Sequence, residues 1–355
     1  MIRVLALTKY DTRAASARLR FAQFVEPLER LGISLELSPL LDDRYIERKF
    51  STGRLPFSSL AGAIERRLGA LAKLRHYDAA IIHYELFPYA PALFERLLAK
   101  LAVPYILDYD DAIFHQYDQH KSRIVRTVLG QKIAQVIGGA KAVFAGSNYL
   151  ADYARRYNPQ VHLVPTVIDV SRYRRVDRER PRTADLSIAW IGSPSTSDYL
   201  SLIAPALTRV ATHKKLRLIA TGAKPLEIPG VEVQVRPWSE ATEVSDLLES
   251  DVGVMPLPDT PWAWGKCAFK LIQYMGCALP VVASPVGANR DVVRDGVDGF
   301  WASLEQEWVN ALLKLEADPA LRARMGDAGR ARVEQSYSIE AVVPTIAQVI
   351  KGVVG

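Results

Sequence analysis

Cysteine is scarce in this chain: its 355 residues include only two, Cys267 and Cys277. Two cysteines argue against a disulfide framework and fit the reducing cytoplasm. No group of Cys and His has the spacing of metal ligands, so we expect neither a metal nor another cofactor. No stretch approaches the ~20 consecutive apolar residues that a membrane-spanning helix needs. The amino terminus lacks the long apolar run of a secretory signal, so we expect a cytoplasmic protein.

Two common phosphate-binding fingerprints are also missing. No G-x-G-x-x-G follows the first apolar run, and no G-x-x-x-x-G-K-[ST] occurs in the chain. Dinucleotide binding of the NAD type and P-loop chemistry are therefore poorly supported. No internal repeat of about 20–50 residues is visible either.

The chain does have charge of opposite sign in its two halves. Residues 1–175 contain 26 Lys and Arg against 17 Asp and Glu, a positive surplus of nine. Residues 176–355 contain 19 against 22, a negative surplus of three. A basic half presents either an ordinary solvated face or a surface for an anionic partner, such as a membrane or a phosphorylated acceptor. The sequence leaves both open, and we expect no nucleic-acid partner.

Short apolar runs rich in Val and Ile alternate with segments of helical periodicity. In the first half, strands are expected at residues 4–7, 79–83, 105–107, 142–145 and 161–164, and helices at 21–31 and 92–101. This alternation predicts an α/β domain with a parallel sheet. The pattern stops at residues 172–186, which are dense in charge and resemble an interdomain linker.

The same pattern then restarts. Strands are expected at residues 186–191, 217–220, 231–235, 252–255 and 280–283, and helices at 198–212, 244–248, 268–275, 308–337 and 339–353. We therefore predict two Rossmann-like domains, residues 1–172 and 185–337, whose parallel sheets face each other across a cleft. The terminal helix, about residues 338–355, is expected to pack back on the first domain. Ligands of such sheets bind at the carboxyl ends of the strands.

The most informative stretch is residues 253–300. A buried strand leads into a loop that ends in Gly265 and Lys266, and a helix begins near Ala268. The free N–H groups of a helix start, with Lys266 and Lys270 nearby, favour an anion such as phosphate. Many α/β proteins have Gly-Lys before a helix, so this physics alone does not identify a site.

The segment KLIQYMGCALPVVASPVGANRDVVRDGVDGF resembles the donor-binding region of family-4 glycosyltransferases (glycosyl transferases group 1), retaining enzymes of the GT-B fold. Its PVVAS run at residues 280–284, with Gly287 and Gly299, falls on the family pattern. The resemblance extends to the strand-loop segment IAWIGSPST, the region of Trp238, the strand DVGVMPL and the junction VHLVPTVIDVSRY. The amino-terminal half matches only loosely.

Three positions depart from that family pattern. Gly265 and Gln273 stand where the family has two glutamates, and Ala278 stands where it has a glycine. In the family the second Glu binds the ribose hydroxyls, a place where Gln273 can donate and accept hydrogen bonds but offers no charge. The first Glu contacts the donor sugar, which Gly265 cannot do.

The resemblance implies a donor site in the second domain that includes Trp238 and Gln273. Lys266 or Lys270 can take over a diphosphate contact, because departure of a nucleoside diphosphate builds negative charge that a cation stabilises. We count Lys270 as catalytic for this reason.

The family's usual pair of cations after the first strand of the second domain is also replaced. The loop here contains Gly192, Ser193, Ser195 and Thr196, with hydroxyls and no cation. Such a loop can hold phosphate through N–H and O–H donors. The alternative is that its hydroxyls cap the helix that follows.

Candidates for the acceptor side follow the strands of the first half. Tyr10, Ser16, Arg18 and Arg20 come after the first strand, and the two arginines suit an acceptor phosphate or the donor diphosphate. The alternative is a solvent-facing first helical turn. Glu85, at another strand end, is a further candidate.

Aspartates cluster at the end of a strand in LDYDDAIFH, residues 107–115. The resemblance places Asp110 or Asp111 where the family often has a catalytic His or Asp, which would orient the acceptor hydroxyl or stabilise positive character on the sugar. Asp-x-Asp is also the metal motif of the GT-A fold, but catalysis in GT-B enzymes is usually metal-independent. Capping of the following turn is the alternative for both.

Residues 58–76 predict an amphipathic basic helix. Its apolar face comprises Leu60, Ile64, Leu68, Leu71 and Leu74, and its basic face Arg66, Arg67, Lys73 and Arg75. Such a helix suits peripheral contact with the inner membrane face in an enzyme that acts on a lipid-linked sugar. It is equally compatible with an ordinary packed surface helix.

The sequence thus predicts a retaining glycosyltransferase. It would move a sugar from a UDP-, GDP- or dTDP-linked donor to a hydroxyl of a saccharide or lipid-linked acceptor, in cell-surface polysaccharide or glycan assembly. The resemblance suggests a front-face mechanism in which the leaving phosphate helps to deprotonate the acceptor. A nucleotide-sugar epimerase of the same fold and a non-catalytic sugar-nucleotide-binding protein stay open as alternatives.

Overall fold

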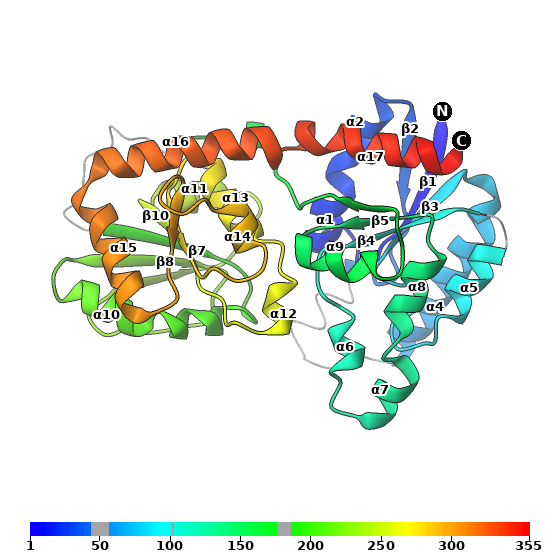
Figure 1. The fold of residues 1–355 in the computed structure, drawn as a ribbon, viewed down its shortest axis with the longest axis horizontal. Helices are drawn as coiled ribbons and strands as arrows, with labels where there is room; N and C mark the ends of the chain where they lie inside the picture. The colour runs from blue at the N-terminus through cyan, green and yellow to red at the C-terminus, as the bar shows by residue number, and fades with distance from the viewer. Residues whose placement is uncertain (44–56, 101–102, 176–185) are drawn as a thin grey trace. The chain divides into compact units, whose positions relative to one another are not determined.

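The computed structural model of the chain describes residues 1–43, 57–100, 103–175 and 186–355 (Figure 1). Its contacts divide the chain into two compact units. The first unit comprises Met1–Thr166 and Val342–Gly355, and the second comprises Val167–Ala341. The predicted linker, residues 172–186, lies mostly outside the described residues.

The first unit is built on a six-stranded parallel sheet in the order β2-β1-β3-β4-β5-β6. Its strands are β1 (Ile2–Leu7), β2 (Ile33–Leu37), β3 (Ala79–His83), β4 (Tyr105–Tyr109), β5 (Ala142–Ala145) and β6 (Val161–Leu163). β3, β4 and β5 are buried along their whole length. Parallel strands covered on both faces by helices are continuous apolar runs, which is the pattern seen in their sequences.

Helices connect these strands and cover the sheet. They are α1 (Ala15–Arg20), α2 (Val25–Glu29), α4 (Phe57–Lys73), α5 (Leu93–Lys100), α6 (His115–Asp118), α7 (Arg123–Leu129), α8 (Lys132–Gly139) and α9 (Asn148–Arg155), with short 3-10 turns η1 (Ala22–Phe24) and η2 (Leu74–His76). The terminal helix α17 (Ile339–Val354) enters the first unit and lies beside α2 in Figure 1. Ile346 of α17 lines one small pocket together with Phe24 and Leu28.

The second unit has its own six-stranded parallel sheet, in the order β12-β11-β10-β7-β8-β9. Its strands are β7 (Leu186–Ile191), β8 (Leu216–Thr221), β9 (Glu232–Arg236), β10 (Val252–Met255), β11 (Val281–Ala283) and β12 (Gly299–Trp301). This order is that of a Rossmann-type sheet. The predicted α/β class with two Rossmann-like parallel sheets is therefore confirmed.

The second sheet is also covered by helices. They are α10 (Ala204–Ala211), α11 (Glu243–Leu248), α12 (Pro261–Trp264), α13 (Phe269–Gly276), α14 (Asn289–Val292), α15 (Glu305–Ala317) and α16 (Pro319–Ser336), with 3-10 turns η3 (Val170–Arg172) and η4 (Ser197–Leu202). The buried residues of α13 join a core cluster with those of β10 and β11. This helix carries two of the predicted donor-site residues.

Two strands have no counterpart in the strands expected from the sequence, β2 and β12. Each is an edge strand of its sheet. β2 is only partly buried, and β12 is three residues long. Such strands give a weak apolar signal because they have one neighbour and one solvated side.

The single helix expected over residues 308–337 is two helices. Asp318 lies between them, and its carboxylate accepts a hydrogen bond from the backbone N–H of Leu321 at 2.8 Å. Pro319 then occupies the first turn of α16, where a proline is tolerated because no N–H is needed. The Asp-Pro pair therefore ends one helix and begins the next.

Helix α4 turns a different face inward from the apolar face seen in its sequence. Ala63, Arg67 and Ala70 are buried, whereas Ile64 and Leu68 are 41% and 46% exposed. Arg67 donates to the backbone oxygens of Thr8 (2.6 Å) and Ser38 (3.3 Å), and burial lowers its pKa to about 9. Among the described residues, no helix combines the length and the apolar character that a membrane crossing requires.

The packing of α16 on the end of α13 generates a stability prediction. A Cβ at Gly326 of α16 would lie 1.9 Å from the backbone oxygen of Ala278, whereas a Cβ at Gly69 of α4 would meet nothing within 4 Å. Ala normally stabilises a helix interior by about 1 kcal/mol over Gly. We expect Gly69→Ala to follow that rule and Gly326→Ala to reverse it, with a loss of about 1–3 kcal/mol in the free energy of unfolding.

Calorimetric unfolding of both variants measures the difference. At roughly 2–4 °C per kcal/mol for a unit of this size, Gly326→Ala should lower the melting temperature of the second unit. An unchanged or higher melting temperature for Gly326→Ala would mean that α16 is not packed this closely on α13.

Candidate active site

The carboxyl ends of the strands form one edge of each parallel sheet, and the order of strands reverses once in each. In the second sheet the reversal lies between β7 and β10, and in the first between β1 and β3. Ligands of open α/β sheets bind in the crevice at such a point. Side chains at these two edges are therefore the candidates for function.

The loop after β7 holds the predicted hydroxyl residues. Ser193 and Ser195 share a hydrogen bond between their hydroxyls at 2.9 Å, and the Thr196 hydroxyl donates to the Ser193 backbone oxygen at 3.1 Å. Thr196 precedes the turn η4, but its side chain makes no capping hydrogen bond there. The alternative of an N-cap at Thr196 is therefore not realised, and the hydroxyls instead bond to one another.

Lys270 of α13 reaches the same loop. Its ammonium lies 4.0 Å from the centre of the Trp190 ring and 3.4 Å from the Thr196 hydroxyl. A Cβ at Gly192 would lie 2.6 Å from this nitrogen and 2.6 Å from the Trp190 ring, so a side chain there would displace one or both. Burial, with the charge of Lys266 as a second cause, lowers the pKa of Lys270 to about 7.

The loops after β7, β8 and β9 lie side by side because the three strands end level. β7 pairs with β8 up to Ile191 and Thr221, and β8 pairs with β9 up to Thr221 and Arg236. Gly222, which follows β8, has a φ of +78°, and a Cβ there would lie 2.1 Å from the backbone oxygen of Gly192 and 3.2 Å from Cβ of Trp238. Trp238 is 38% exposed, so its ring offers an apolar surface at this edge.

Gln273, one turn after Lys270 on α13, is buried in a polar triangle. Its side-chain nitrogen donates to the hydroxyl of Tyr173 at 2.9 Å and to the carboxylate of Glu243 at 3.3 Å. Tyr173 in turn donates to Glu243 at 3.1 Å, and the indole N–H of Trp238 donates to the same carboxylate at 3.1 Å. All three side chains are buried: 3% of Gln273, 5% of Glu243 and 4% of Tyr173 is exposed to solvent.

These contacts close into a ring at the carboxyl edge of the second sheet, which we call the polar ring. Its members are Gly192, Gly222, Trp238, Glu243, Gln273 and Lys270. It brings together a cation, a carboxylate, an amide, an exposed indole and two glycines without side chains. Of these, Gly192, Trp238, Gln273 and Lys270 are predicted from the sequence.

Glu243 and Tyr173 are not among the residues predicted from the sequence. Glu243 begins α11 and, as a first-turn acid, is indistinguishable in sequence from an ordinary helix start. Tyr173 is the last residue of the junction segment VHLVPTVIDVSRY. The sequence therefore singled out its segment, but not its contact with Glu243. Their contact with Gln273 spans 30 and 100 residues of chain.

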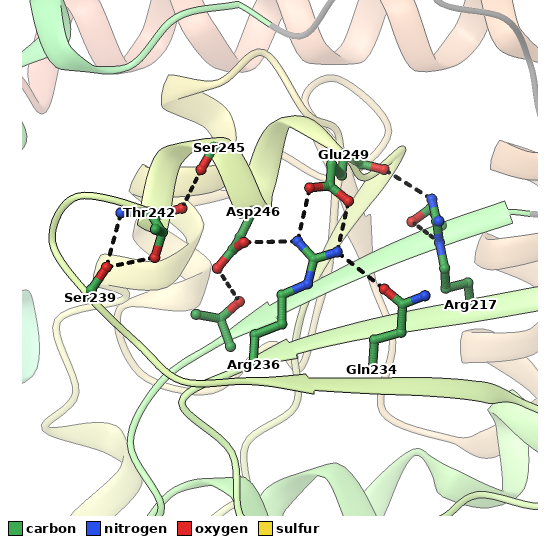
Figure 2. Close-up of polar contacts among 10 residues, drawn as sticks. Arg217, Gln234, Arg236, Ser239, Thr242, Ser245, Asp246 and Glu249 are labelled. Carbon is green, nitrogen blue, oxygen red and sulfur yellow. Dashed lines mark hydrogen bonds and ion pairs between the residues drawn. The ribbon is translucent and has the colours of Figure 1, made fainter.

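Helix α11 is fixed to the sheet by a second polar network (Figure 2). Arg236 of β9 pairs with Asp246 of α11 and with Glu249, which directly follows this helix, each at 2.8 Å. Asp246 also accepts a hydrogen bond from the Thr221 hydroxyl of β8 at 3.1 Å. Because both strands hold the helix, the first-turn Glu243 has a fixed position.

The remaining predicted donor residue of the second unit, Lys266, lies between α12 and α13. The ammonium of Lys266 lies 5.2 Å from the centre of the Trp262 ring. Ala278, which stands at the family's glycine position, has a φ of +59°. This is the left-handed region, which glycine adopts more easily than alanine.

In the first unit, Asp110 lies at the end of β4 against residues from the end of β3. His83 Nε2 is 3.3 Å from the Asp110 carboxylate, and the hydroxyl of Tyr84 donates to the same carboxylate oxygen. Burial alone would raise the pKa of Asp110, but the hydrogen bond and charge of His83, with the charge of Arg20, hold that pKa well below its usual value. Tyr84 has a φ of +67°, a strained conformation for a bulky residue.

Lys9, which follows β1, faces this cluster. Its ammonium lies 5.6 Å from the ring centres of both Tyr10 and Tyr84. Burial lowers the pKa of Lys9, and the charges of Glu85, Asp111 and Asp110 oppose that shift. Asp110, Asp111 and Tyr10 therefore share one neighbourhood with a cation.

Two of the predicted acceptor residues are instead held inside the first unit. Arg20 forms a buried ion pair with Asp108 and donates to the Val164 backbone oxygen at 2.6 Å. Glu85 forms a buried ion pair with Lys132 and accepts a hydrogen bond from Tyr117 at 2.8 Å. Both side chains thus join elements of the fold, while Ser16 and Arg18 on α1 are partly exposed.

In the described part of the chain, no three His, Cys, Asp or Glu side chains are arranged to hold a metal ion. Cys277 is buried, and burial raises the pKa of its thiol to about 12. The groups present at the two edges can bind anions, accept hydrogen bonds from hydroxyls and stack on a flat ring.

Comparison with known proteins agrees with this geometry. Residues 185–318 match the family model described as Glycosyl transferases group 1. A segment of 78 residues is 40% identical to alpha-maltose-1-phosphate synthase of Mycobacterium tuberculosis, and this match spans 19% of this chain and 19% of that protein.

Solved structures resemble the whole chain. Sucrose-phosphate synthase of Thermosynechococcus elongatus superposes with a TM-score of 0.71 at 16% identity, covering 99% of both chains. HepE of Anabaena, solved in complex with UDP and glucose, superposes with a TM-score of 0.71 at 14% identity, covering 99% of this chain and 100% of that one. The chain therefore has the GT-B fold, and its residues 185–318 are similar to the group 1 glycosyltransferases.

Proposed function

We propose that this protein transfers a sugar from a nucleotide-sugar donor to a hydroxyl group, with retention of configuration at the anomeric carbon. The observation that carries the proposal is the polar ring, which lies at the switch point of the second sheet within the segment that matches the family model. The diphosphate of the donor would lie at Lys270 and the hydroxyl loop, and the base against the exposed ring of Trp238. A cation at the leaving diphosphate stabilises the charge that develops there.

Uridine diphosphate is the first nucleotide to consider. HepE, which shares the fold, was solved with UDP and with UDP-glucose. GDP- and dTDP-linked sugars remain alternatives for this chain. By analogy with proteins of this fold, the acceptor we propose is a saccharide or lipid-linked sugar in cell-surface polysaccharide or glycan assembly.

The acceptor would bind at the carboxyl edge of the first sheet. Asp110 is ionised at neutral pH because its pKa is held low, so it can accept a hydrogen bond from an acceptor hydroxyl. An ionised carboxylate also stabilises positive character on the sugar ring. No step of this proposal requires a metal ion.

Sugar transfer is measured as nucleotide release from UDP-glucose, GDP-mannose and dTDP-glucose, each with and without saccharide and lipid-linked acceptors. We expect acceptor-dependent release and, by NMR, a product with the anomeric configuration of the donor. Asp110→Asn should lower kcat by about 10²–10⁴-fold and leave UDP binding intact, because Asp110 lies in the other unit. The matched control is Asp152→Asn, at an exposed carboxylate paired with Arg155.

The alternatives give different results in the same assay. An epimerase would convert the donor without an acceptor. A non-catalytic binding protein would bind nucleotide and release none. Inversion of configuration would contradict the retaining mechanism.

The low pKa of Lys270 predicts proton uptake when the diphosphate binds. Above pH 7 the free amine is mostly neutral, and a bound anion raises its pKa, so the affinity for UDP should fall by up to about tenfold per pH unit. Calorimetry between about pH 7.5 and 9 tests this, since a terminal phosphate with a pKa of about 6 no longer titrates there. Lys270→Met should bind UDP more weakly and with an affinity that no longer falls with pH, whereas Lys214→Met should keep this pH dependence. The same pH dependence in the wild-type chain and in both variants would contradict a Lys270–phosphate contact.

Peripheral membrane contact through α4 is a further part of the proposal. Ile64 and Leu68 are exposed one turn apart on a helix that also carries Arg66 and Lys73. Apolar side chains beside cations favour an anionic lipid interface. Co-sedimentation with vesicles of phosphatidylglycerol and phosphatidylethanolamine should fall severalfold in Ile64→Ser/Leu68→Ser, and not in the control Glu65→Gln; equal sedimentation would leave α4 an ordinary surface helix.

A further inference from the structure

The orientation of the Gln273 amide is fixed by its neighbours. Its nitrogen faces two acceptors, the hydroxyl of Tyr173 at 2.9 Å and the carboxylate of Glu243 at 3.3 Å. The Tyr173 hydroxyl uses its own proton on Glu243 at 3.1 Å, so it receives rather than donates at Gln273. A flipped amide would point its oxygen at the carboxylate, which is unfavourable because both groups only accept.

Both N–H donors of this amide are therefore directed into the protein. The group that Gln273 can still offer to a ligand is its oxygen, an acceptor. A ligand group that meets this oxygen must donate a hydrogen bond, as a hydroxyl does.

Glu243 also explains why position 273 holds an amide and not a carboxylate. A glutamate there would place a second carboxylate about 3.3 Å from Glu243. Two carboxylates that close cannot both be ionised without a large penalty. The chain thus has one carboxyl group at this place, on α11, and an amide on α13.

The place of Gln273 in the polar ring indicates which hydroxyl it meets. On one side lies the exposed ring of Trp238, which shares Glu243 with Gln273. On the other side lies Lys270, one helical turn away on α13. In a nucleoside diphosphate the ribose lies between the base and the phosphates, so a base on Trp238 and phosphates at Lys270 place the ribose hydroxyls near Gln273.

We propose that Glu243 is a positioning residue of the donor site, which holds the Gln273 nitrogen inward so that the Gln273 oxygen accepts a hydrogen bond from a ribose hydroxyl. This inference rests on the proposed nucleotide-sugar site. Helix α11 cannot move away to release the amide, because Arg236 ties it to β9 through Asp246 and Glu249 (Figure 2). Glu243 itself does not need to touch the nucleotide.

The test is the preference for ribose over deoxyribose, measured by calorimetry with UDP and GDP and with their 2′-deoxy and 3′-deoxy forms. The wild-type chain should bind at least one deoxy form about tenfold more weakly, as expected for the loss of one hydrogen bond. In Glu243→Gln the Gln273 amide is free to turn over, so this preference should fall below about threefold. The control Glu305→Gln, at an exposed first-turn glutamate of α15 outside the polar ring, should retain the preference.

A charge exchange separates positioning from mere stability. Gln273→Glu alone should lose ribonucleotide affinity at neutral pH by about tenfold or more, because two carboxylates then face each other. The double variant Gln273→Glu/Glu243→Gln restores one carboxylate and one amide with the donor on α11. It should recover both the affinity and the preference for ribose.

These measurements separate the positioning role of Glu243 from the nucleotide site itself. If Glu243→Gln weakens ribo- and deoxynucleotides equally, or if the double variant fails to recover the preference, the positioning role is wrong although the nucleotide site stands. If neither UDP nor GDP binds the wild-type chain, the proposed nucleotide site is wrong, and so is the role of Glu243 that rests on it.

Discussion

The hydroxyl of Tyr274 joins helix α13 to two strands of the second sheet at once. It donates to the backbone oxygen of Val254 on β10 at 3.3 Å and accepts from the backbone N–H of Ile191 on β7 at 3.0 Å. The ring fits because Gly253 has no Cβ, which would otherwise lie 2.3 Å from it. These two strands flank the switch point, so this one side chain holds α13, with Lys270 and Gln273, against that point of the sheet.

The polar ring depends on that placement. Lys270 and Gln273 reach neighbouring parts of the ring because they are one helical turn apart on a helix fixed at Tyr274. On its far side α13 rests on α16, where Gly326 permits close approach. A shift of α13 would therefore move the Lys270 ammonium away from Gly192 and the Gln273 amide away from Glu243.

Buried cations of this chain are compensated in different ways. In the first unit Arg20 and Lys132 are paired with Asp108 and Glu85, and Arg67 donates to two backbone oxygens. Lys270 lies on an indole ring and beside hydroxyls instead, and burial lowers its pKa. Because this folded pKa lies below the unfolded value, the amine costs stability below about pH 7, and that cost is relieved as pH rises toward 10.5. Strongly shifted groups of this kind are typical of functional sites, where a ligand supplies the missing charge.

The sequence by itself determined the two parallel α/β units, because buried parallel strands are apolar along their whole length and that pattern is local. It also indicated Lys270, Gln273 and Trp238, since each lies in a segment with a recognisable pattern. The edge strands β2 and β12 left a weaker signal, because one solvated side dilutes their apolar character.

Only the tertiary structure decided which side chains meet. Arg20 and Glu85 have charged side chains of the kind that bind ligands. Their partners, 88 and 47 positions away in sequence, nevertheless lie inside the fold. In the sequence Glu243 is an ordinary acidic residue of a first helical turn, yet in the structure it contacts Gln273, 30 residues further along the chain. Periodicity reports which face of an element is buried, but a hydrogen bond between two elements depends on their register, and no local pattern records it.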